Sequence, residues 1–150
     1  MRFVSAGGCP PSVYQELQAR ATPSAVRLWL SSQPAWLEVV SHSETADSQL
    51  NYLGAGERDA ILLAKELGAD GLLIDDRDGR REATRRDLRV IGTLGVLAAA
   101  AEKELLDLPE AIERLRGTTF RASPQLFDVL LERFEKSSKE SVESKNRRKT

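Results

Sequence analysis

A chain of 150 residues, 41% hydrophobic and 30% charged, has the composition of one globular domain that buries most of the surface its unfolded form exposes. No apolar run approaches the roughly 18 to 20 residues of a membrane span, and the start, MRFVSAGGCPP, lacks the apolar stretch of a secretory signal. The single cysteine excludes an internal disulfide and a thiolate zinc site, and it favours the reducing cytoplasm as the location.

The net charge of -1 is unevenly distributed along the chain. The last fifteen residues, KSSKESVESKNRRKT, hold six basic and two acidic residues, so this segment carries +4 and the rest carries -5. A segment with almost no apolar residues does not offset its own ordering entropy. We therefore predict a folded domain over residues 1–135 and a basic disordered tail over residues 136–150, and we favour a solvated tail over a polyanion-binding one.

The first third of the chain predicts two helices and a strand. The prolines of CPP suit a first helical turn, and SVYQELQA continues with Tyr14 and Leu17 on one face. ATPSAVRLWLSS predicts a second short helix, and WLEVV, residues 36–40, predicts a strand. Residues 41–53 are polar and predict irregular structure.

The remainder of the chain alternates between helix and strand. Ile61 and Leu67 lie on a helical stripe that ends at Gly68, a suitable left-handed cap. GLLI and RVIG predict short buried strands, separated by the polar helix RDGRREATRRDL and followed by the alanine-rich helix TLGVLAAAAEKELL. Two more helices are predicted from Pro109 and Ser123. Strands joined through helices by tight connections indicate a parallel α/β sheet.

Four carboxylates are predicted at one edge of this sheet. Asp75 and Asp76 end the GLLI strand, Asp78 lies two residues beyond, and Glu57 starts the preceding helix. Residues at the carboxyl ends of parallel strands and in the next helical turns converge on one crevice. Clustered carboxylates repel one another, and a hard divalent cation relieves that repulsion, so the pattern favours Mg²⁺ or Mn²⁺.

Each of these acids also has a purely structural explanation. Glu57 is stabilised in a first helical turn by the helix dipole, and Asp after a strand is a common turn and cap residue. Two other kinds of site are disfavoured: GAGERD lacks the third glycine and the preceding strand of a dinucleotide loop, and the only histidine, His42, lies in a polar stretch without the partners of a nucleophilic triad.

The polar helix beside the acids is rich in arginine. Its arginines and those that flank it are Arg77, Arg80, Arg81, Arg85, Arg86 and Arg89. Arg77, Arg81 and Arg85 share one helical stripe, so they form a candidate site for RNA phosphates. The alternative is an ordinary solvated helix, in which Asp78 and Glu82 pair with arginines three or four residues away.

These motifs resemble those of PIN-domain-like proteins of the VapC-related group often encoded near toxin-antitoxin systems. The run LGAGERDAILLAKELGADGLLIDDRDGRREATRRDLRVIGTLGVL carries most of the resemblance, with CPPSVYQEL upstream and FRASPQLFDVLLER downstream. GE-x-x-AI, LLxDD and VxGTLGVL follow one another with suitable spacing. The resemblance implies an α/β fold with a PIN-like (Rossmann-like) parallel sheet, flanking helices and a helical C-terminus.

The resemblance also implies an activity and a set of site residues. Active relatives are Mg²⁺- or Mn²⁺-dependent endoribonucleases that use three or four acids. Glu57 matches the helix-start Glu of the family, and Asp76, with Asp75 as the close alternative, matches the strand-end Asp. Asp78 is expected to assist as an outer ligand, and Thr93 lies where relatives bring another strand end to the site.

One departure from the family bears on activity. Family members begin with an apolar strand that ends in an Asp ligand, and here no carboxylate precedes the VYQEL helix. We therefore expect the N-terminal central strand to be missing or degenerate and turnover on RNA to be weak or absent. The alternative is a catalytically inactive protein that binds an antitoxin, a related subunit or a second copy of itself through unpaired sheet edges.

Overall fold

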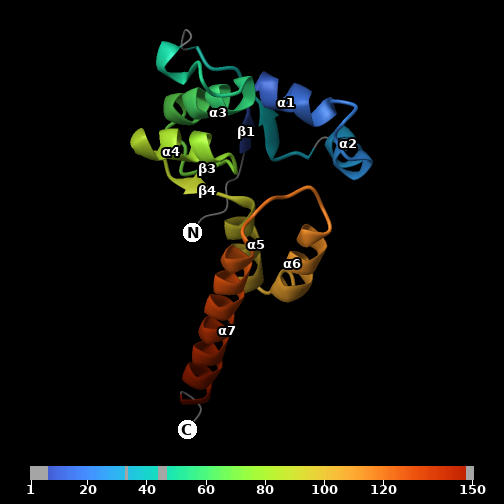
Figure 1. The fold of residues 1–150 in the computed structure, drawn as a ribbon, viewed down its shortest axis with the longest axis vertical. Coiled ribbons are helices and arrows are strands. Elements are labelled where there is room, and N and C mark those ends of the chain that lie inside the picture. Colours follow the sequence, from blue (N-terminus) through green and yellow to red (C-terminus); the bar gives the residue numbers. More distant parts are fainter. Residues whose placement is uncertain (1–6, 33, 44–46, 148–150) are drawn as a thin grey trace. The chain divides into compact units, whose positions relative to one another are not determined.

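The computed structural model describes residues 7–32, 34–43 and 47–147, with side chains as far as residue 136 (Figure 1). It contains two compact units, one ending at Gly92 and the other beginning at Thr93. The elements of the first unit are β1 (Gly7–Cys9), α1 (Pro11–Gln18), α2 (Ser24–Ser31), β2 (Leu37–Val39), the 3-10 turn η1 (Ser48–Leu50), α3 (Ala55–Glu66), β3 (Leu72–Leu73), α4 (Arg77–Arg85) and β4 (Val90–Ile91).

The strands of the first unit form two parallel pairs. β1 pairs with β2, with Gly7 opposite Leu37, and β3 pairs with β4, with Leu72 opposite Val90. These pairings confirm a mixed α/β fold with parallel strands. Among the described residues the two pairs are not hydrogen-bonded to each other, so the single flanked sheet that the resemblance implies is seen only in part.

The strand β1 is a feature that the sequence pattern did not predict. The N–H of Gly7 donates to the carbonyl of Trp36 at 2.6 Å, and the N–H of Val40 donates to the carbonyl of Cys9 at 3.0 Å. The Trp36 ring packs 3.3 Å from the position that a Cβ of Gly7 would take. A residue larger than glycine at position 7 would therefore crowd this ring. Residues 1–6, the short stretch before β1 in which no family strand was recognised, lie outside the described part of the chain.

Helix α3 packs against both strand pairs. Leu63 and Leu67 contact β1 at Gly8, where a Cβ would lie 3.6 and 3.2 Å from their methyl carbons. On another side of the helix, the fully buried Ile61 and Leu62 belong to one apolar cluster with residues of β3 and α4. Each buried aliphatic side chain of this kind contributes roughly 1.5–3 kcal/mol, so α3 is the element that holds the first unit together.

The polar stretch between β2 and α3, predicted to be irregular, makes specific contacts with α3 and with the apolar cluster. The Nε2 atom of His42 lies 3.6 Å from Oδ1 of Asp59 on α3. Further along, the N–H of Ser43 donates to the carboxylate of Glu66 at 2.7 Å. Leu50, in η1, is fully buried in the apolar cluster. Polar contacts at its start and the buried side chains of Leu50 and Leu53 near its end therefore fix this segment.

The second unit is helical. Its elements are α5 (Thr93–Glu102), α6 (Leu108–Arg116) and α7 (Pro124–Arg147). Asp107 caps α6 by accepting a hydrogen bond from the N–H of Glu110 at 2.8 Å, and the proline that follows suits the first turn. Leu108 and Ile112 are fully buried in a cluster that includes Phe127 of α7. The predicted helices after the second strand pair are thus confirmed.

Helix α7 continues as far as Arg147, into the segment predicted to be a basic tail. The domain boundary at residue 135 and the disorder of residues 136–150 remain predictions. No helix in the described part of the chain has both the length and the apolar character needed to cross a membrane.

Candidate functional site

The carboxyl end of β3 carries two of the predicted acids. The N–H of Ile74 donates to the carbonyl of Ile91 at 3.0 Å, so the pairing with β4 extends up to Asp75. Asp76 is the N-cap of α4, and its Oδ1 accepts a hydrogen bond from the N–H of Gly79 at 2.8 Å. The structural explanation of Asp76 therefore holds, and the cap fixes its carboxylate at the start of α4.

Glu57 approaches the same helix start from α3. It is the third residue of α3, and its carboxylate folds back over Gly54, the N-cap, where a Cβ would collide with Oε2. Its Cγ lies 3.4 Å from the position that a Cβ of Gly79 would take. Gly79 therefore lies beside the Cγ methylene of Glu57 and donates to the carboxylate of Asp76, although these two acids are 19 positions apart in the sequence.

Asp75, at the end of β3, lies next to the end of β4. Its Oδ1 is 2.9 Å from the position that a Cβ of Gly92, directly after β4, would take. The guanidinium of Arg80 occupies the same place, with Nη1 2.7 Å from that position and donating at 2.9 Å to the carbonyl of Ile74. Asp75 thus lies beside a cation that the protein itself supplies.

Asp78 is placed differently from the other three acids. Its carboxylate lies 3.3 Å from Nη2 of Arg81, one turn further along α4. Both side chains are largely exposed, so water screens the pair and its contribution to stability is small. Asp78 is exposed and paired with Arg81, and its predicted role as an outer ligand stays a prediction.

The structure adds a fifth carboxylate, Glu16, which was not among the predicted site residues. Glu16 lies on α1, and both of its carboxylate oxygens are 2.9 Å from the position that a Cβ of Gly56 would take. Gly56 is buried and directly precedes Glu57 in the first turn of α3. The signal in the sequence was the VYQEL segment, which belongs to the resemblance but was interpreted only as a helix.

These carboxylates do not form a ready-made metal cage. Within the part of the chain that the structure describes, no three His, Cys, Asp or Glu side chains are close enough together to hold an ion. The donors are nevertheless all carboxylate oxygens, which hard divalent cations prefer. Mg²⁺ usually keeps several waters and takes only one or two protein carboxylates together with substrate phosphates. Glu57 and Asp76 fit that lesser requirement.

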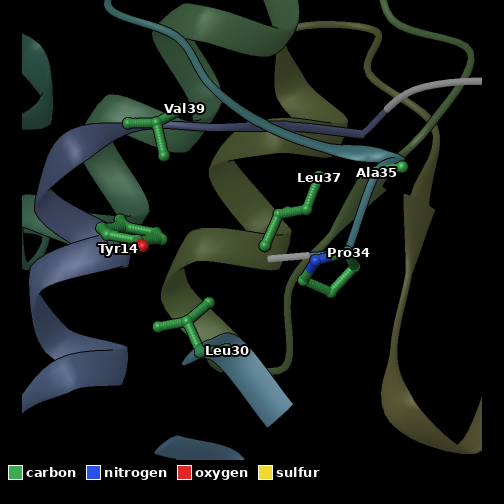
Figure 2. A pocket seen from close by; sticks show the side chains of 6 residues that line it. All are labelled: Tyr14, Leu30, Pro34, Ala35, Leu37 and Val39. Atoms are coloured by element: carbon green, nitrogen blue, oxygen red, sulfur yellow. The ribbon is translucent and has the colours of Figure 1, made fainter. Parts of the chain in front are cut away.

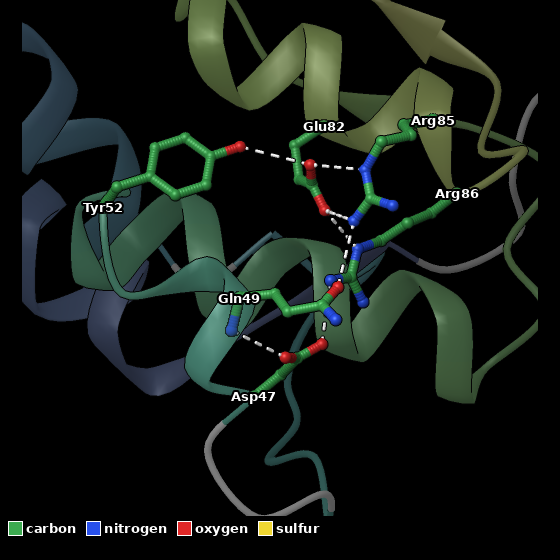
Figure 3. A network of polar contacts seen from close by, with 6 residues as sticks. All are labelled: Asp47, Gln49, Tyr52, Glu82, Arg85 and Arg86. Carbon is green, nitrogen blue, oxygen red and sulfur yellow. Dashed lines mark hydrogen bonds and ion pairs between the residues drawn. The ribbon is translucent and has the colours of Figure 1, made fainter.

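A second polar cluster, on the other side of α4, engages one of the predicted phosphate ligands (Figure 3). The carboxylate of Glu82 is 5% exposed and accepts hydrogen bonds from Arg85 at 2.7 and 2.9 Å and from Arg86 at 2.7 Å. The hydroxyl of Tyr52 donates to it at 3.1 Å, and Arg86 also pairs with Asp47 at 2.8 Å. We call these five residues the Glu82 network.

The pKa of Glu82 reflects this network. The hydrogen bonds from Arg85, and after them those from Arg86 and Tyr52, lower the pKa of Glu82 from 4.5 to about 2, against the opposing effect of burial. The guanidinium of Arg85 is therefore largely committed to Glu82 and to the side-chain oxygen of Gln49 at 3.2 Å. All three arginines of the predicted stripe are exposed, and of these Arg77 and Arg81 are not bound by Glu82.

A hollow formed by residues of α1, α2 and the segment through β2 is apolar (Figure 2). It has a volume of about 310 Å³ and is lined by Tyr14, Leu30, Pro34, Ala35, Leu37 and Val39. Beside it, Trp29 and Trp36 stack at 5.8 Å between ring centroids with a 44° tilt. Apart from the hydroxyl of Tyr14, the side chains that line it are apolar.

The comparisons with known proteins give one match. The model of a family described as a PIN domain (DUF3368) matches residues 5–136 of the chain. No curated protein and no solved structure matches it.

Proposed function

This chain belongs to the PIN-domain family, and we propose that it hydrolyses phosphodiester bonds of RNA with Mg²⁺ or Mn²⁺, as VapC-type toxins do, at low turnover. PIN domains commonly use Mg²⁺. The observation that supports the proposal is the approach of Glu57 and Asp76 to the same residue, Gly79, at the carboxyl edge of β3. A parallel α/β sheet binds its ligands at this edge.

Glu57 and Asp76 would hold the ion, with Asp75 and Asp78 in outer positions. Glu16, beside the first turn of α3, is the further carboxylate that the fold supplies. When bound, such an ion lowers the pKa of a bound water and stabilises the charge of a phosphodiester under attack. Turnover is low in this proposal because no three of the described carboxylates converge.

Two features of the chain at the carboxyl edge of β3 support RNA hydrolysis there. The cap at α4 uses Oδ1 of Asp76, which fixes the carboxylate at the start of the helix, and an ionised carboxylate has a second oxygen that can accept or coordinate. The exposed Arg77 and Arg81 on α4 would meet the phosphate backbone of a single strand, since Lys and Arg contacts to phosphate supply most of the affinity for RNA. Arg85 would contribute less, because Glu82 binds it.

Cleavage of a labelled RNA in the presence of Mn²⁺ tests the proposal. We expect Glu57→Gln, which keeps the shape of the side chain and removes its charge, to lower the cleavage rate at least as much as the roughly 10- to 100-fold that loss of an outer-shell partner costs. Glu38→Gln is the matched control, because Glu38 is exposed on β2. Cleavage that is unchanged in Glu57→Gln, or that persists in EDTA, contradicts the proposal.

A second candidate function is binding without catalysis, to an antitoxin, a related subunit or another copy of this chain. Exposed apolar side chains in the segments that line the hollow favour it: Leu28, on α2, is 74% exposed and Trp36, between Ala35 and Leu37, is 51% exposed. Such side chains close together on a surface are typical of interaction sites. Light scattering distinguishes the two functions for self-association, since a monodisperse monomer over a wide concentration range counts against a homodimer.

A further inference from the structure

We propose that Arg80, rather than Arg85, is the arginine that holds an RNA phosphate against the carboxyl ends of β3 and β4. This inference rests on the proposed function, because it assigns a substrate-binding residue to the same edge. Arg80 lies on α4 and is partly buried. Its Nη1 donates at 2.9 Å to the carbonyl of Ile74, at the end of β3, so the guanidinium lies over the strand ends and not in the solvent.

Gly92 makes room for this guanidinium. A Cβ on residue 92 would lie 2.7 Å from Nη1 of Arg80 and 2.9 Å from Oδ1 of Asp75, both closer than ordinary van der Waals contact. The two obstructing groups are the ends of side chains, so an alanine here would displace them at little cost to the backbone. A glycine directly after β4 therefore allows Arg80 and Asp75 to share the end of the sheet.

Three other arginines in or directly after α4 are paired with carboxylates. Arg85 and Arg86 bind Glu82, and Arg81 pairs with Asp78. Arg80 donates to a neutral carbonyl, and the carboxylate of Asp75 is the acid closest to its guanidinium that the described contacts show, beside Gly92. A guanidinium has five N–H donors in a rigid fork that matches phosphate oxygens. With one donor bound to Ile74, the others remain to bind an anion.

The guanidinium of Arg80 lies close to one of the candidate acids, because it shares the space beside Gly92 with Asp75. The backbone N–H of Arg80 donates to the carbonyl of Asp76 at 2.9 Å. The residue before it is Gly79, which lies beside Cγ of Glu57 and donates to Oδ1 of Asp76. A phosphate bound by Arg80 would therefore lie at the same edge as the carboxylates proposed for the cation. Arg77 and Arg81, on the solvent side, would contact phosphates further along the strand.

The test measures binding of a fluorescent single-stranded RNA in EDTA, which prevents cleavage, at several salt concentrations. We expect Arg80→Met to weaken binding by about tenfold, since a hydrogen-bonded charge is lost. The slope of log K against log salt should fall in magnitude by about 0.7, the value for one phosphate contact to a single strand. Gly92→Ala should reproduce the weaker binding with a nearly unchanged melting temperature, and Arg20→Met, at an exposed arginine outside α4, is the control.

A purely structural role for Arg80 predicts different results. In that case Arg80→Met lowers the melting temperature but leaves the RNA affinity and the salt slope as in the wild type, and Gly92→Ala has no effect on RNA. Either result overturns the inference. Arg80→Lys adds a further check, because a lysine keeps the charge without the fork: it should preserve most of the salt slope but not the full affinity.

The inference and the proposed function fail in different experiments. Wild-type protein that binds RNA in EDTA but does not cleave it with Mn²⁺ overturns the hydrolysis proposal. The RNA affinity and salt slope of Arg80→Met then still decide the inference about Arg80. Cleavage that depends on Glu57 but is equal in the wild type and in Arg80→Met overturns the inference alone. Wild-type protein without measurable affinity for RNA overturns both.

Discussion

At the scale of single residues, glycines determine where the charged side chains of the site lie. Gly56 admits the carboxylate of Glu16, and Gly79 is in contact with both Glu57 and Asp76. None of these contacts requires an unusual backbone, since the one glycine with a left-handed conformation is Gly68, after α3, among the described residues. The missing Cβ provides space, which the carboxylate of Glu16 occupies at Gly56 and the side chains of Ile74 and Glu57 occupy at Gly79.

Glu82 provides the residue-scale prediction. Its pKa is lower in the folded state, about 2, than the ordinary 4.5, so its stabilising effect is complete above pH 4.5 and is lost as the pH falls toward 2. Because the Arg85 side chain is 59% exposed and water screens the pair, we expect a loss of only about 1–2 kcal/mol in the free energy of unfolding. Urea denaturation across this range measures it.

The matched variants for this prediction are Glu82→Gln and Glu38→Gln. Glu82→Gln should lower the stability at neutral pH, because Arg86, with 11% of its side chain exposed, loses one of its two carboxylates. The same variant should also show a flatter dependence on pH between 4.5 and 2. A dependence as steep in Glu82→Gln as in the wild type would mean that another carboxylate causes the acid sensitivity.

At the scale of elements, the sequence predicted the helices well and the connections poorly. α3, α4, α5 and α6 lie where periodicity, caps and prolines placed them, because those signals depend on neighbours within a few positions. The strands GLLI and RVIG were found at the right places and are paired over only two residues each. Local patterns contain enough information for such elements.

The features that the sequence did not reveal depend on distant partners. β1 exists because of its pairing with β2, and the polar segment before α3 is fixed by contacts to α3 and α4. In the site, Glu57, Asp75, Asp76 and Asp78 were identified from their places at element ends. Glu16 and Arg80 were not assigned, since only the packing of α1 on α3 and the path of the Arg80 side chain over the strand ends show their positions.

At the scale of the whole molecule, the family and the chemistry support each other. The chain is a PIN-domain protein over residues 5–136, and the first unit supplies acids and arginines at one sheet edge. The second unit is an apolar helical cluster whose core contains none of the candidate site residues. The proposed chemistry therefore belongs to the first unit, and variants there are the informative ones.

The measurement that tests the central claim most directly is the binding of Mn²⁺, followed by the electron paramagnetic resonance signal of the free ion. Three variants accompany the wild type: Glu57→Gln, Asp76→Asn and Glu38→Gln. Asparagine is a good N-cap, so Asp76→Asn should keep α4 folded while removing the charge. We predict uptake by the wild type and by Glu38→Gln, and affinity at least about tenfold lower in the other two. No uptake by the wild type, or equal uptake by all four proteins, would contradict a cation shared by Glu57 and Asp76.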